Sequence, residues 1–401
     1  MKTLYLHIGT PKTGTSAIQH FLLKNNAVLA EHGYRFPKLP CAYTYARDNR
    51  NGYFITQKQG YAKGLKQILT CFEDSDHVIL TEENLWRYFH TSPTAAQKLK
   101  DHADANGYQI RVIVYLRRQD EYMESLWKEN IKHAKHFSSL TYEQRLSEIL
   151  ENESFLLTYA SRLDALAEVF GQEQLIIRRY EKDTWKNGLI IDDFLDCIGL
   201  EHTEDFRDLE KPKNLSLSAN TAQIMRIINK NQQFTPEEKT YLVRFVREIS
   251  PDSQAQQPCS MLSTAEAEEL LQRFAEENTR VANEYINDGN PLFQPIQPLI
   301  KWTPDNPQFT EDMIRLFSIT TIDLKRENAQ LHEQIDDLSL TISGLQRDIQ
   351  KLQQERASIK KTEKDVKRLS TDVKKLQSSL QSLKNKLKHP FRTLWNRLFH
   401  R

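Results

Sequence analysis

The feature that most constrains the fold is a strand, a tight loop and a helix that follow one another within the first 23 residues. Residues 4–8 form a mostly apolar run that predicts a buried strand, and residues 17–23 have the apolar spacing of a helix. Gly9 and Gly14 lie between them and let the backbone curl tightly, because neither has a Cβ. Such a loop before a helix N-terminus gathers backbone N–H groups around a phosphate.

The loop departs from the nucleoside-triphosphate motif G-x-x-x-x-G-K-[ST] at one position. Gly9, Gly14 and Ser16 occupy motif positions, but Thr15 stands where the lysine belongs. The only lysine in the loop is Lys12, which would meet a phosphate from the loop side and not from the first helical turn. The pattern therefore predicts a phosphate site that serves chemistry other than ordinary ATP or GTP hydrolysis.

Buried strands that alternate with helices predict the fold class. The predicted strands are residues 4–8, 77–81, 110–116 and 175–180. This alternation favours an α/β fold, a P-loop-like parallel sheet flanked by helices with right-handed crossovers. Ligands of such sheets bind outside the carboxyl ends of the strands. The polar residues just past predicted strand ends are Lys12, Glu82, Glu83, Arg117 and Tyr180.

Length and composition fit one sizeable domain with an added segment. The chain has 401 residues, 39% of them hydrophobic, and its net charge of +1 gives no reason to expect a nucleic-acid partner. Its four cysteines are far apart and predict reduced thiols, not disulfides or a metal site. Neither a signal peptide nor a membrane-spanning run is apparent. We therefore expect a cytoplasmic protein without a metal.

The C-terminal part has the heptad pattern of a coiled coil. Apolar residues occupy a and d positions from Leu324 to Leu352, with Asn328 at one a position. Arg356 and Glu363 interrupt this seam, which then resumes, shifted by three residues. The pattern predicts that the sheet domain is followed by a long C-terminal coiled-coil helix. At about 1.5 Å per residue, this rod would be on the order of 95 Å long. Its a and d residues favour a parallel homodimer.

These patterns divide the chain into three predicted parts. A Pro-rich exit ends the first domain, residues 1–307, and the coiled coil covers residues 308–389. Pro390 is expected to stop the rod. Residues 390–401 place apolar side chains on one helical face and basic ones on the other. Residues 391–401 could therefore contact an anionic membrane peripherally at its inner face, or pack on a partner.

The run Pro11, Lys12, Thr13, Gly14, Thr15, Ser16 resembles the 5′-phosphosulfate loop, P-K-x-G-[ST]-[ST], of sulfotransferases that use 3′-phosphoadenosine 5′-phosphosulfate (PAPS). That family also has an arginine at the end of a central strand and a serine eight residues later. Arg117 and Ser125 match this second motif. The proline common two positions after the arginine is Gln119 here, which makes Arg118 a rival for the role. The resemblance covers roughly residues 1–300.

The resemblance implies roles for these residues. Backbone N–H groups from Thr13 to Ser16 would hold the 5′-phosphate, and Lys12 would neutralise the oxygen that bridges phosphorus and sulfur. Arg117 and Ser125 would bind the 3′-phosphate, and Tyr180 would lie near the nucleotide. The implied reaction is in-line transfer of a sulfuryl group from PAPS to an acceptor hydroxyl or amine. By analogy with the family, a glycan or a lipid-linked sugar is the expected acceptor.

The general base and the overall function have alternatives. Glu83 aligns with a glutamate of related bacterial enzymes, while Glu82 and His7 are the other candidates for the base. A P-loop nucleotide kinase or NTPase is an alternative function, but the loop lysine and a magnesium-binding aspartate are missing. A non-catalytic coiled-coil scaffold with a degenerate head is another alternative. The presence of Lys12, Arg117 and Ser125 argues against it.

Overall fold

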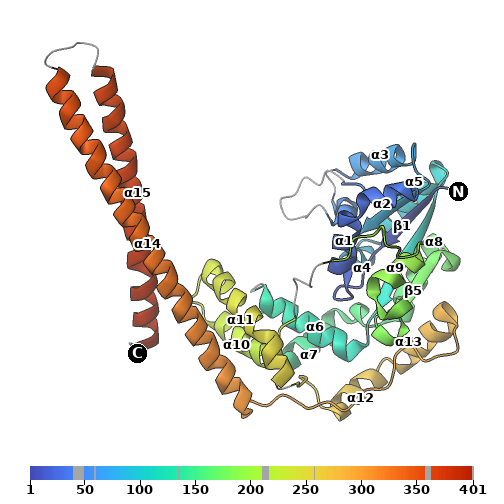
Figure 1. Ribbon diagram of the computed structural model, residues 1–401. Coiled ribbons are helices and arrows are strands. Elements are labelled where there is room, and N and C mark those ends of the chain that lie inside the picture. Colours follow the sequence, from blue (N-terminus) through green and yellow to red (C-terminus); the bar gives the residue numbers. More distant parts are fainter. Residues whose placement is uncertain are drawn as a thin grey trace. The chain divides into compact units, whose positions relative to one another are not determined.

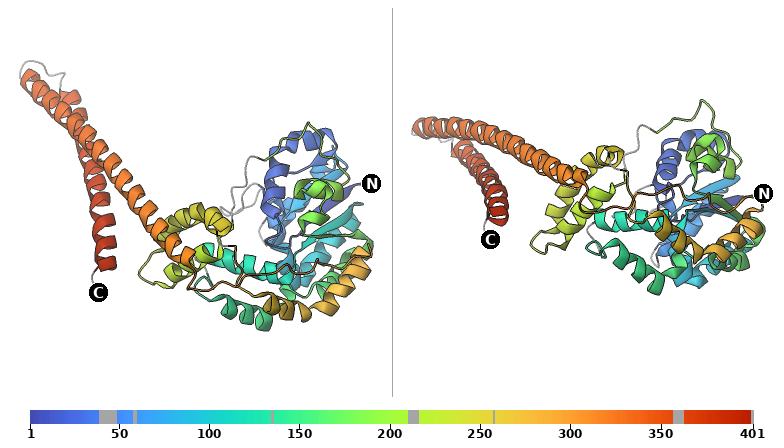
Figure 2. Two further views of the ribbon diagram at one scale, coloured as in Figure 1. Left: turned by 60° about the horizontal axis from the view of Figure 1, so that its bottom comes forward. Right: turned by 90° about the horizontal axis from the view of Figure 1, so that it is seen from below.

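The computed structural model describes residues 1–38, 49–57, 60–133, 136–209, 216–256, 258–356 and 363–399 (Figures 1 and 2). The chain divides into two units, Met1–Asp312 and Met313–Arg401. The second unit thus begins a few residues into the long helix α14 (Pro307–Arg356).

The first unit is built on a five-stranded sheet in which all neighbouring strands are parallel. The strand order is β2-β3-β1-β4-β5, with β1 at the centre. The strands are β1 (Thr3–His7), β2 (Tyr34–Arg35), β3 (His77–Thr81), β4 (Gln109–Leu116) and β5 (Leu175–Arg179). The predicted α/β class and the four predicted strands are confirmed. The two-residue strand β2 is the addition, too short to give a pattern of its own.

Helices connect the strands and form the rest of this unit. The α-helices are α1 (Thr15–Lys24), α2 (Asn26–Glu31), α3 (Tyr61–Cys71), α4 (Leu85–Thr91), α5 (Pro93–Ala105), α6 (Gln119–Lys132), α7 (Tyr142–Asn152), α8 (Tyr159–Phe170), α9 (Ile190–Cys197), α10 (Ala219–Lys230), α11 (Pro236–Gln256), α12 (Thr264–Gln272) and α13 (Ala275–Arg280). A π-helix, Val281–Ile286, continues α13. Short 3-10 helices cover residues 51–56, 154–156, 172–174, 182–184 and 186–188.

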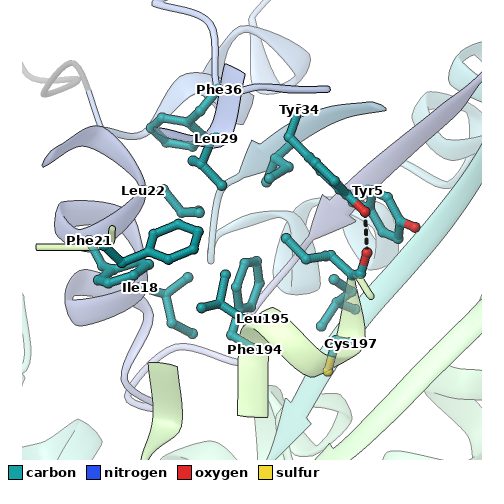
Figure 3. Packing of buried hydrophobic residues seen from close by; sticks show 14 of the residues in the cluster. Tyr5, Ile18, Phe21, Leu22, Leu29, Tyr34, Phe36, Phe194, Leu195 and Cys197 are labelled. Atoms are coloured by element: carbon teal, nitrogen blue, oxygen red, sulfur yellow. Dashed lines mark hydrogen bonds between the residues drawn. The ribbon is translucent and has the colours of Figure 1, made fainter. Parts of the chain in front are cut away.

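Apolar side chains cover both faces of the sheet, which is why its strands read as nearly continuous apolar runs. On one face, α1, α2 and α9 close a core of buried residues that includes Tyr5, Phe21 and Phe194 (Figure 3). Tyr34 belongs to this core, and its hydroxyl donates a hydrogen bond to the carbonyl oxygen of Ile198 at 2.6 Å. Helix α5 packs against β4, and helix α8 packs against β4 and β5.

The register of the sheet brings four loops to one edge. His7, the last residue of β1, pairs with Thr81, the last residue of β3. On the other side His7 pairs with Ile113 of β4, and Leu116 at the end of β4 pairs with Arg179 at the end of β5. The segments that follow these strands therefore lie near one another at the carboxyl edge.

The second unit contains two helices where the sequence predicts a single rod. Helix α14 ends at Arg356 and α15 runs over Glu363–Phe399, in the opposite direction (Figure 1). The interruption of the heptad seam thus falls at the ends of two helices. Ile342 of α14 and Val373 of α15 are each only 7% exposed, as expected where two helices of one unit pack together. The predicted long C-terminal helix is confirmed by α14, but two helices stand in place of one continuous rod. The homodimer stays a prediction.

The predicted stop at Pro390 is also wrong. Helix α15 continues through this proline to Phe399. A proline inside a helix removes one backbone hydrogen bond and crowds the carbonyl four residues before it, which can kink a helix without ending it. Among the helices in the described ranges, none is both long and apolar enough to span a bilayer.

Candidate anion-binding site at the carboxyl edge of the sheet

The loop between β1 and α1 is fixed to two neighbouring segments. The N–H of Thr10 donates to the carbonyl of Tyr115 at 3.0 Å, and the N–H of Tyr115 donates to the carbonyl of Gly9 at 2.8 Å. Gly9 has a φ of 105°, and a Cβ there would lie 3.1 Å from the carbonyl oxygen of Glu83. Only glycine therefore lets the loop lie this close to the segment that follows β3.

The N-terminus of α1 has the properties of an anion site. Gly14 is its N-cap residue, with a φ of 74°, and it has no side chain that could accept from the first-turn N–H groups. The Thr15 hydroxyl is buried and has no hydrogen-bond partner within the described part of the chain. Uncapped N–H groups and the helix dipole both favour an anion at this end.

Arg117, at the end of β4, lies directly against the loop. Its Nη1 donates to the carbonyl oxygen of Lys12 at 3.2 Å. Its guanidinium carbon lies 5.3 Å from the centroid of the Tyr180 ring, which follows β5. The same ring lies beside Gly14, where a Cβ would be 3.2 Å from Tyr180 Cε2. The structure thus brings together Lys12, Gly14, Arg117 and Tyr180, predicted from three separate stretches of sequence.

Arg118, the rival of Arg117, is occupied elsewhere. Its side chain is only 9% exposed, and its Nε and Nη2 donate to the two carboxylate oxygens of Asp120 at 2.8 and 3.0 Å. It also pairs with Glu121 at 3.1 Å. Arg117 pairs with Glu121 as well, at 3.2 Å, but 22% of its side chain is exposed. Of the two arginines, Arg117 is the one that can contact a ligand at the loop.

One face of α6 lies toward the loop. Glu121, Ser125 and Glu129 are spaced by four residues and therefore share a face of this helix. Glu121 pairs with Arg117, and the Oε2 of Glu129 lies 2.8 Å from the Nζ of Lys12. Ser125, between them, is 8% exposed. Ser125 therefore lies on the same face of α6 as Glu121 and Glu129, the two residues that contact Arg117 and Lys12.

The partner of Lys12 is a residue that sequence reasoning missed. Glu129 accepts from Lys12 and from Nε2 of His133 at 2.7 Å, and Lys132 lies 3.8 Å away. Burial alone would raise the pKa of Glu129, but the hydrogen bond with His133 and the charge of Lys12 outweigh burial and lower it. The signal in the sequence was the four-residue spacing of Glu129 from Ser125 on one helix face.

The two candidate bases after β3 have different environments. Glu82 is fully buried, accepts from Nε of Arg50 at 3.0 Å and also pairs with Arg50 Nη2. Burial and the nearby charge of Glu83 raise the pKa of Glu82 to about 7, against the opposing effect of Arg50. Glu83 is 23% exposed, accepts from Gln19 at 3.0 Å and lies 3.5 Å from Arg50. Of these two carboxylates, that of Glu83 is the one accessible to solvent.

His7 ends β1 at the carboxyl edge of the sheet, but its side chain lies in the core. Its side chain is fully buried, edge-on to the rings of Tyr115 and Phe194. Neither ring nitrogen has a hydrogen-bond partner among the residues described, and burial lowers the pKa of His7 to about 3. The imidazole is therefore neutral at physiological pH and out of reach of an acceptor molecule. This contrasts with the hydrogen-bonded core histidine that is the usual alternative.

Within the described ranges, no group of three or more His, Cys, Asp and Glu side chains is arranged to hold a metal ion. The hydrogen-bond donors at the carboxyl edge are the Lys12 ammonium, the Arg117 guanidinium, the Thr15 hydroxyl and the backbone N–H groups that begin α1. This set suits an anion that carries phosphate or sulfate oxygens.

Comparisons with known proteins give limited matches. No family model matches the chain. An uncharacterised protein of Archaeoglobus fulgidus is 27% identical over 184 residues, 45% of this chain. The match spans 47%, about half, of that protein's length. A solved sulfotransferase from Alicyclobacillus acidocaldarius is 13% identical, with a TM-score of 0.40, over 72% of this chain and 97% of that one.

Proposed function

We propose that this protein is a sulfotransferase that moves a sulfuryl group from PAPS to a hydroxyl or amine of an acceptor. The observation that carries the proposal is the 3.2 Å hydrogen bond from Arg117 to the Lys12 carbonyl. The resemblance of the two sequence motifs implies that these residues contact opposite ends of one nucleotide. The hydrogen bond shows that the segments that carry them are neighbours at the carboxyl edge. Two cationic side chains carried by neighbouring segments support a ligand with two anionic groups.

The donor is a substrate that the described side chains fit. The uncapped N-terminus of α1 and the unpartnered Thr15 hydroxyl suit its 5′-phosphate. Arg117 has five N–H groups, of which the described contacts use two, so three remain for a 3′-phosphate. Ser125 offers a hydroxyl on the same side. The Tyr180 ring, already stacked with Arg117, would line the space between the two anion sites.

The transfer breaks the bond between sulfur and the oxygen that bridges sulfur to phosphorus, and forms a bond between sulfur and the acceptor oxygen or nitrogen. Negative charge grows on the departing oxygen, where the Lys12 ammonium would neutralise it. The acceptor gives up a proton, which Glu83 would take because its carboxylate is exposed. The products are the sulfated acceptor and 3′-phosphoadenosine 5′-phosphate. We propose a glycan or lipid-linked sugar as the acceptor class.

Calorimetry with two nucleotides tests the proposal. We expect 3′-phosphoadenosine 5′-phosphate to bind and ATP with magnesium not to bind, because the loop lacks the first-turn lysine of nucleotide kinases. Binding of ATP alone would support a kinase or NTPase instead. If neither nucleotide binds, the head domain is a scaffold and the proposal is wrong.

Mass spectrometry then tests the reaction itself. Candidate sugars are incubated with PAPS and the full chain, and a product heavier by one sulfuryl group is expected. The Lys12→Ala variant is the matched control, because it keeps the backbone of the loop but removes the ammonium. Sulfation by this variant at the rate of the unchanged protein would contradict the role of Lys12.

A further inference from the structure

The ammonium of Lys12 forms an ion pair with the carboxylate of Glu129. Its Nζ is 2.8 Å from Oε2 of Glu129, and the two side chains are only 26% and 30% exposed. Lys12 itself is in the left-handed region, with a φ of 68°. This ion pair joins the loop to α6 at the residue that the proposed reaction most requires.

Glu129 is held firmly in its position. Its Oε1 lies 2.7 Å from Nε2 of His133, one turn further along the chain, and its Oε2 is 3.8 Å from Lys132. Against the effect of burial, His133, Lys12 and Lys132 together keep the pKa of Glu129 below its ordinary value. The carboxylate is thus charged at neutral pH. If Lys12 turned away, His133 and Lys132 would still contact this carboxylate.

An anionic nucleotide at the loop and Glu129 compete for the same ammonium. A charged pair in a partly buried site interacts more strongly than it would in water. The ammonium can give its full charge to the bridging oxygen of the donor only after it turns away from Glu129. When the nucleotide product leaves, the same carboxylate is ready to take the ammonium back.

We propose that Glu129 is a positioning residue that holds Lys12 while the site is free and weakens the binding of the nucleotide product. This inference rests on the proposed function. A Glu129→Gln variant keeps the shape of the side chain but removes its charge. Because one competing charge-assisted hydrogen bond is lost, we expect 3′-phosphoadenosine 5′-phosphate to bind about tenfold more tightly. Its dissociation should be slower by a similar factor.

A double-mutant cycle tests the proposal by calorimetry with 3′-phosphoadenosine 5′-phosphate. The proteins are the unchanged chain, Glu129→Gln, Lys12→Ala and the double variant. We expect the gain in affinity from Glu129→Gln to disappear in the Lys12→Ala background, because Glu129 acts through Lys12. Glu143→Gln, an exposed change on α7, removes the same charge away from this ion pair and should leave affinity unchanged.

The outcomes separate this inference from the proposed function. Unchanged or weaker binding by Glu129→Gln, with a melting temperature equal to that of the unchanged chain, overturns the role of Glu129 alone. A gain that persists without Lys12 does the same. If Glu129→Gln does not fold, Glu129→Ala provides the same cycle. If the unchanged chain does not bind the nucleotide at all, the proposed function fails and the inference fails with it.

Discussion

Replacing Arg117 by alanine should remove the preference of the site for a nucleotide with a 3′-phosphate. The described contacts of Arg117 use one N–H for Glu121 and one for the Lys12 carbonyl, so three N–H groups remain for a ligand. Hydrogen bonds to charged groups contribute roughly 1.5–3 kcal/mol, which corresponds to about 10- to 150-fold in affinity. The side chain is 22% exposed, so solvent weakens the interaction and the lower end, about tenfold, is expected.

Calorimetry with two adenine nucleotides isolates this effect. 3′-Phosphoadenosine 5′-phosphate has both phosphates and adenosine 5′-phosphate lacks the 3′ group, so the ratio of their affinities reports the 3′ contact. Arg117→Ala should lower this ratio about tenfold. Arg117→Lys should lower it less, because lysine keeps the charge but not the planar fork. Lys98→Ala, which removes an exposed positive charge on α5, is the control and should not change the ratio.

The affinity for adenosine 5′-phosphate also shows whether the loop is intact. Arg117 supports the Lys12 carbonyl, so its loss could disturb the 5′-phosphate site as well. In that case both nucleotides would bind more weakly and the ratio would stay constant. A constant ratio in Arg117→Ala would therefore refute the assignment of Arg117 to the 3′-phosphate and leave it a role in loop structure only.

Four further predictions concern the reaction, the base, a buried ion pair and the tail. Lys12→Ala should lower turnover by ~10²–10³-fold in a sulfate-transfer assay, the size expected for one lost electrostatic contact in the transition state; near-normal turnover contradicts it. Glu83→Gln should lower kcat by ~10²-fold or more without a change in melting temperature. Arg50→Ala should instead lower the free energy of unfolding by roughly 3 kcal/mol, because Glu82 stays buried without its partner; equal unfolding midpoints in urea contradict it. Replacing Leu331 and Leu338, two half-buried seam positions, with lysine should convert the proposed dimer to a monomer in sedimentation equilibrium. An unchanged mass would argue against a dimer that forms through this seam.

The sheet could be predicted from the sequence because its strands are buried on both faces. β4 is apolar over most of its length and reads as a strand without any tertiary information. β2 has only two residues and is a strand because β3 lies beside it. The end of α15 shows the opposite case. A proline predicts a stop from local rules, yet the helix continues through Pro390.

The neighbours of each site residue depend on contacts that local patterns do not contain. Lys12 and Glu129 are 117 residues apart, and only the packing of α6 against the loop makes them an ion pair. Glu82 and Glu83 are adjacent and chemically alike in sequence. Arg50 binds mainly the first and buries it, while the second stays open to solvent.

The sequence by itself determined the parallel sheet, the loop that follows β1 and the two arginines at the end of β4, because each depends on residue types at short range. The tertiary structure decided which arginine is available, which carboxylate faces solvent and what Lys12 contacts. These outcomes depend on burial and on charges that come from distant parts of the chain. Their physical reason is that the free energy of a charged side chain is set by its surroundings in space, which chain order alone does not define.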